Sequence, residues 1–79
     1  MARVMLEPLA ERPAWAVRVE GQRVGVAWRE RGMFRALREG ESEPLATKFR
    51  SREAAAKALA RRAGFEDLDQ TVAVEDPRS

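Results

Sequence analysis

The feature that most constrains the fold is an alternation of apolar and other residues on both sides of a glycine. Two runs, residues 14–20 and 23–29, alternate in this way around Gly21-Gln22. Their regularly spaced apolar members are Trp15, Val17, Val19, Val24, Val26 and Trp28. A period of two is that of a β-strand with one buried face. A two-residue loop that begins with glycine predicts a type II′ hairpin between these strands.

This loop fixes which residues lie opposite each other. With Gly21-Gln22 as the loop, Val19 faces Val24 and Trp15 faces Trp28. All the apolar side chains then share one face, whereas a slip of one residue would turn every second one away. We therefore predict that both tryptophans lie on the inner face, against the rest of the core.

A second turn, Glu30-Arg31-Gly32, leads into a third strand. Glycine at the last position of a three-residue loop is typical of a type I turn followed by a G1 bulge. Such a loop places Trp28 opposite Phe34 on the inner face, whereas a two-residue loop would place Trp28 opposite Arg35. The three-residue loop predicts a three-stranded antiparallel meander over residues 14–39.

Residues 51–63 favour one alanine-rich α-helix. Ser51 is a good N-cap, and Glu53 lies in the first turn, where the helix dipole favours a negative charge. Gly64 and Phe65 follow the last turn in the positions of a Schellman motif. The stripe expected to face the sheet consists of Ala55, Ala58, Leu59 and Ala63.

These elements predict a small α+β fold, a three-stranded antiparallel meander packed on one α-helix. The 79 residues are expected to form one domain, with a core at residues 14–65 and an acidic segment at residues 66–79. Segments Arg3–Glu7 and Thr71–Glu75 could add short terminal strands. The core of so short a chain is thin, which makes self-association a real alternative.

Composition narrows the chemistry that the chain can perform. It contains no Cys, His or Tyr, which excludes disulfides and removes the commonest general base and zinc ligand. Glu66, Asp67 and Asp69 lack the glycine and the terminal glutamate of a calcium-binding EF-hand loop. No base is expected to activate Ser51 as a nucleophile. We therefore expect no enzyme, no metal site and no cofactor.

Charge is unevenly distributed along the chain. The net charge is +2, but residues 1–65 carry +6 and residues 66–79 carry −4. The cations comprise 13 Arg and only 2 Lys. Arginine suits bidentate binding of phosphate or carboxylate, although a GC-rich genome produces the same bias.

The first residues of the chain do not form an uninterrupted apolar run, because Glu7, Glu11 and Arg12 break it. No stretch is long enough to span a bilayer. We therefore expect a cytoplasmic protein with no membrane partner.

The candidate binding residues lie on the outer face of the predicted sheet. Ala16, Gly25 and Ala27 are expected along the middle of that face. Around these small residues are four arginines: Arg18, Arg23, Arg29 and Arg35. Such a face could approach a nucleic acid, with guanidinium groups that bind phosphates or base edges. The alternative is an ordinary solvated face. Met33 and Leu37 fit neither expectation, and they indicate that another segment or a second subunit covers part of the face.

Three segments carry a family resemblance: Gly32–Arg38, Leu45–Phe49 and Ser51–Ala63 with its Glu-Ala-Ala start. This plan resembles the APETALA-type DNA-binding domain and is similar to the arm-binding domain of tyrosine integrases. In those families a three-stranded sheet enters the major groove while a helix braces its back. The resemblance covers about residues 14–63. It implies DNA contacts by Arg18, Arg23, Arg29 and Arg35.

Two functions therefore stay open at the level of sequence. The first is a nucleic-acid-binding module that uses the arginine-lined face. The second is a dimeric protein-interaction or antitoxin-like module, with Met33 and Leu37 at the interface, because the HicB-like antitoxin fold uses a related β-β-β-α order. In the first function the partner is DNA or RNA, and in the second it is another copy or another protein.

Overall fold

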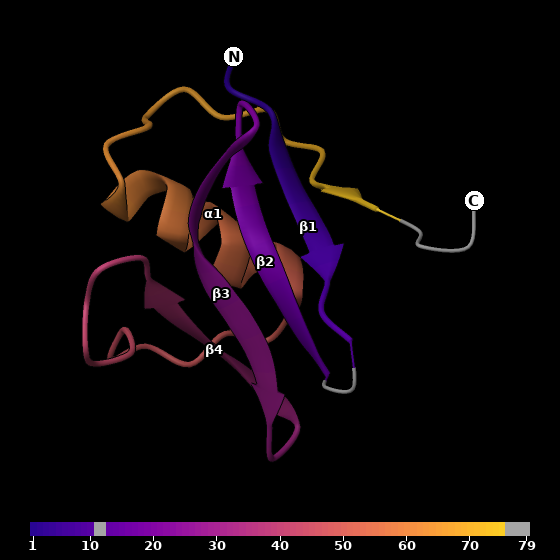
Figure 1. The fold of residues 1–79 in the computed structure, drawn as a ribbon, viewed down its shortest axis with the longest axis vertical. Coiled ribbons are helices and arrows are strands. Elements are labelled where there is room, and N and C mark those ends of the chain that lie inside the picture. Colours follow the sequence, from indigo (N-terminus) through magenta and orange to yellow (C-terminus); the bar gives the residue numbers. More distant parts are fainter. Residues whose placement is uncertain (11–12, 76–79) are drawn as a thin grey trace.

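The computed structural model describes residues 1–10 and 13–75, which form a five-stranded sheet and one α-helix (Figure 1). The elements are β1 (Val4–Pro8), β2 (Ala14–Val19), β3 (Gln22–Glu30), β4 (Met33–Arg38), α1 (Arg52–Arg62) and β5 (Ala73–Val74). The strands lie in the order β4-β3-β2-β1-β5. β1 to β4 pair as antiparallel neighbours, and β5 runs parallel to β1. The helix lies across one face, and the opposite face is called the outer face below (Figure 1).

The α+β class is confirmed, but the meander has four strands where three were predicted. The additional strand is β1, whose Val4 and Leu6 lie opposite Val19 and Val17 of β2. All four side chains are fully buried. β1 offers only two alternating apolar positions, which is too short a pattern to distinguish a central strand from an edge strand. The part of the acidic segment at residues 76–79 lies outside the described residues.

The first hairpin turn lies one residue earlier than predicted. Its central residues are Glu20 and Gly21, with φ angles of 51° and 80°, and Val19 pairs with Gln22 across it. Positive φ at both central positions is typical of a type I′ turn, whose twist matches that of the strands. Glycine therefore occupies the second central position of the turn instead of the first.

A β-bulge then shifts the register again. Val17 and Arg18 are consecutive on β2, but their partners on β3 are Gly25 and Arg23. Val24 is the extra residue on β3, and its side chain joins the hydrophobic core.

The resulting register moves one tryptophan to the outer face. Trp15 pairs with Ala27, while Trp28 pairs with Ala14. Because directly paired residues share a face and successive residues alternate, the two tryptophans lie on opposite faces. The predicted pairing of Trp15 with Trp28 is therefore wrong, and Val26 lies on the outer face together with Trp28.

Close packing of the helix explains why small residues lie beneath it. A Cβ atom added at Gly25 would collide with the carbonyl oxygen of Leu37 and lie 3.1 Å from Cδ1 of Leu59. Ala27 and Ala36, on the same face, are fully buried. Gly25 and Ala27 were predicted on the outer face, but in the structure they let α1 approach the sheet.

The second hairpin turn has two residues, not three. Arg31 and Gly32 have φ angles of 52° and 79°, again as in a type I′ turn, and Glu30 belongs to β3. Trp28 therefore lies opposite Arg35, the pairing that the three-residue loop would have avoided.

Both ends of the helix follow the prediction. The Oγ atom of Ser51 accepts a hydrogen bond from the backbone N–H of Ala54 at 3.1 Å. At the other end, Gly64 has a φ of 101°, and the N–H of Phe65 donates to the carbonyl oxygen of Ala60, as in a Schellman motif. The buried stripe is rotated relative to the prediction, with Ala58 and Ala63 only partly buried. It consists of Ala55, Ala56, Leu59 and Ala60.

Candidate functional site

The side chains of the outer face form rows that cross the strands. From β4 towards β1, one row contains Leu37, Val26, Ala16 and Glu7, and the next contains Arg35, Trp28 and Ala14. In the part of the chain that the structure describes, no helix packs on this face (Figure 1). The centre of the outer face is therefore apolar, although an uncovered antiparallel face is usually polar.

This face has a ridge and a hollow. The ridge consists of Val26, Trp28 and Leu37 on β3 and β4, all partly exposed. Beside it, on β2, Ala14 and Ala16 are short and almost fully buried, with 5% and 0% of their surface exposed. The hollow has a volume of about 510 Å³. Its lining residues are Leu9, Pro13, Ala14, Val26, Trp28, Arg29 and Leu37.

Three of the four predicted arginines lie on the outer face, and each forms an ion pair. The shortest nitrogen–oxygen distances are 3.3 Å for Arg18 and Glu7, 3.5 Å for Arg23 and Glu39, and 3.3 Å for Arg35 and Glu30. These contacts compensate much of the positive charge that the sequence placed on this face. The face therefore carries charges of both signs at its margins.

Arg35 is held more firmly than a solvated arginine. Its Nη1 atom bonds to Glu30, and its Nη2 atom lies 3.5 Å from the carbonyl oxygen of Leu45. Its Nε atom is buried and has no hydrogen-bond partner within residues 1–10 and 13–75. The guanidinium group thus packs along the margin of the ridge instead of extending into solvent.

The fourth arginine, Arg29, borders the outer-face hollow but does not share the face of the other three. It pairs with Phe34, which lies on the helix side of the sheet and packs against Trp15 at 5.9 Å between ring centroids. Arg29 borders a second hollow of about 490 Å³ at the start of α1. There Arg52 lies over the ring of Trp15 at 5.1 Å and pairs with Glu53 at 2.9 Å.

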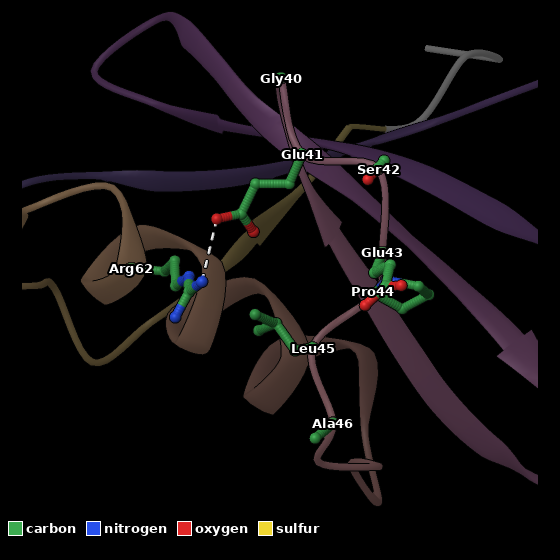
Figure 2. A pocket seen from close by; sticks show the side chains of 8 residues that line it. All are labelled: Gly40, Glu41, Ser42, Glu43, Pro44, Leu45, Ala46 and Arg62. Atoms are coloured by element: carbon green, nitrogen blue, oxygen red, sulfur yellow. Dashed lines mark hydrogen bonds and ion pairs between the residues drawn. The ribbon is translucent and has the colours of Figure 1, made fainter.

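A third hollow, of about 560 Å³, lies between the loop at residues 40–46 and the last turn of α1. Figure 2 shows Glu41 of this loop pointing towards Arg62 of the helix. Their closest oxygen and nitrogen atoms are 2.9 Å apart. The ion pair attaches the loop to the helix, so the most strongly oriented charged groups of this hollow already bind each other.

Among residues 1–10 and 13–75, no charged or polar residue is fully buried, and no group of three or more acidic side chains converges as metal ligands would. No helix in these ranges is long and apolar enough to cross a membrane.

The two predicted interface residues lie on the same strand but contribute differently. Leu37 lines the outer-face hollow, whereas Met33 lies opposite Glu30 at the start of β4. Sequence reasoning missed Val26 and Trp28 as outer-face residues. The available signal was the Arg31-Gly32 turn, since a two-residue loop there places Trp28 opposite Arg35.

Comparison with known proteins does not indicate a family for this chain. No protein-family model, curated protein or solved structure matches the chain.

Proposed function

We propose that this chain is a protein-interaction module that binds its partner through the outer face of the sheet. The observation that carries the proposal is the apolar hollow of about 510 Å³ beside Trp28. Tryptophan and arginine are enriched at the energetic centres of protein interfaces, and apolar groups gather at their cores. Trp28 and Arg35 lie opposite each other on this face.

The architecture supports the same function. A sheet in a small domain usually buries its apolar face against a second layer of structure. Here α1 covers one face (Figure 1). The apolar ridge and the hollow lie on the other face, and the ridge residues are partly exposed. A partner protein would supply the missing layer over Val26, Trp28 and Leu37, which removes their apolar surface from water.

Nucleic-acid binding, which the sequence also predicted, has weaker support on this face. Arg18, Arg23 and Arg35 already contact carboxylates. A phosphate group would have to compete with these carboxylates for the guanidinium groups. The apolar ridge between the arginines also offers a phosphate backbone only one side-chain hydrogen-bond donor, the indole N–H of Trp28.

The proposal describes a binding role without catalysis. Its support is that the charged groups at the margins of the outer face are paired arginines and glutamates, and charges of both signs can orient a partner protein. The cytoplasmic location expected from the sequence stays a prediction.

The test is a photo-cross-linking experiment in the cells that produce the protein. A benzophenone amino acid replaces Leu37, which lines the hollow. In a control variant it replaces Arg61, an exposed residue of the helix. After irradiation we expect a discrete protein adduct from position 37 that is resistant to nuclease and is absent from position 61.

Other outcomes argue against the proposal. Equal adducts at both positions, or no adduct at position 37, would show that the outer face is not a binding surface. A nuclease-sensitive adduct would favour nucleic-acid binding, as would duplex binding that falls steeply between 50 and 200 mM salt (about 10³-fold for six phosphate contacts). The arginine variant R18A/R23A/R35A should abolish such binding.

A further inference from the structure

We infer that the partner of the outer face is a second copy of this chain, related by a two-fold axis parallel to the strands. The inference rests on the proposed function and names its partner. The axis lies in the space between the two facing sheets, over the gap between β2 and β3. β3 of each copy therefore covers β2 of the other. The ridge of each copy then enters the hollow of the other.

Shape supports this arrangement. In the row formed by Leu37, Val26, Ala16 and Glu7, the residues Leu37 and Val26 are large and Ala16 is small. In the next row, Ala14 is the small residue beside Trp28. The proposed axis exchanges the two halves of the row, so Val26 lies over the partner's Ala16. In the next row Trp28 lies over Ala14 of the partner. Val26 and Trp28 thus each lie over a small residue, as close packing between two sheets favours, while Leu37 lies over Glu7 of the partner at the margin of the contact.

The charge distribution of the outer face favours a second copy as the partner rather than a strongly charged molecule. On the outer face, positive side chains are accompanied by negative ones in the pairs Arg18–Glu7 and Arg35–Glu30. Two such faces can approach each other without the repulsion that two uniformly basic faces would meet. A nucleic acid or a strongly acidic protein would gain little from a face whose charges are already paired.

Area sets the expected strength of the dimer. β2 and β4 contain 6 residues each. Four strands spaced about 4.8 Å apart, with about 3.3 Å per residue, give a face of roughly 19 by 20 Å. Interlocking side chains bury more than this flat projection, so the total approaches the ~1,000 Å² at the lower limit of specific interfaces. We therefore expect a reversible dimer that dissociates on dilution.

The absence of cysteine from the sequence makes the arrangement directly testable. The double variant L37C/E7C is treated with a short bis-maleimide cross-linker, alongside the single variants L37C and E7C. Within one chain these positions are three strands apart, roughly 14 Å. Across the proposed axis, Leu37 faces Glu7 of the partner at the distance between packed sheets, about 10 Å.

The expected result is a covalent dimer from the double variant, and from a mixture of the two single variants, but little from either single variant alone. Sedimentation of the unmodified chain should show a monomer–dimer equilibrium. A monomer up to millimolar concentration would overturn the second-copy inference. Efficient cross-linking of L37C in one copy to L37C in the other would overturn the proposed axis, because this axis places the two positions 37 three strands apart.

The two proposals can fail independently. If the chain is monomeric but position 37 is cross-linked in cells to a different protein, the interaction function holds and the second-copy inference is wrong. If position 37 gives no protein adduct and the chain is monomeric, both are wrong. A cellular adduct with the mass of two chains supports both.

Discussion

At the scale of single residues, the distance between helix and sheet depends on Gly25. Its position has no room for a Cβ atom, because the backbone of β4 and the side chain of Leu59 already surround it. The other glycines have open space around them, and their role is to adopt positive φ in turns and at the helix end. Gly25 is thus required for space, and the others for backbone conformation.

The variant Gly25→Ala should therefore be strongly destabilising. The added methyl group must displace the backbone of β4 or the helix, and overpacking of this kind costs about 1 to 3 kcal/mol or more. The matched control is Gly40→Ala, which has open space but a φ of 87° and should cost only about 1 kcal/mol. Urea denaturation of both variants measures the difference. Equal losses would contradict the steric role of Gly25.

At the scale of secondary-structure elements, the two hairpin turns determine what each face presents. Local signals predicted the positions of the strands and the helix well: alternation around Gly21, the cap at Ser51 and the glycine after the helix. Register was not predictable from alternation alone, because a turn shifted by one residue and the bulge at Val24 both preserve an apolar pattern. The preference for type I′ turns, with glycine at the second position, would have decided both loops.

One prediction concerns the second turn. Arg31 has a φ of 52°, a conformation that asparagine adopts more easily than arginine. Replacement of Arg31 by Asn should raise the free energy of unfolding by about 0.5 to 1 kcal/mol, because less backbone strain is stored in the folded state. Arg31→Ala serves as the control, since it removes the same side chain without that preference. If both variants unfold at the same urea concentration, strain at this turn is not significant.

The candidate site was harder to predict than the elements, for a physical reason. The arginines were recognisable in the sequence, but their ion pairs join residues from different strands, such as Arg18 of β2 with Glu7 of β1. The Arg18–Glu7 pair depends on β1 being beside β2, which the three-stranded prediction left open. The hollow likewise requires Trp28 on the outer face, and this placement depends on register.

At the scale of the whole molecule, the proposed dimer predicts that one surface substitution will matter and another will not. Leu37→Lys places a charge on the ridge and should weaken self-association at least tenfold, or about 1.4 kcal/mol. Val74→Lys alters an apolar residue of β5, at the opposite edge of the sheet from β4. Val74 is 39% exposed, which is more than Leu37. This substitution should leave self-association unchanged. Sedimentation velocity over a range of concentrations compares the two, and an equal effect of both would argue against the ridge as the contact.

The parallel pairing of β5 with β1 also affects the order in which the chain assembles. Met5 pairs with Ala73, and the N–H of Glu75 donates to the carbonyl oxygen of Leu6. These contacts join the two ends of the described chain, so they form only after a long loop has closed, whereas the hairpins need only short loops. Folding should therefore begin at the hairpins and finish with the docking of β5. In the native protein the same strand should be the first to open, with the fastest amide hydrogen exchange of the sheet.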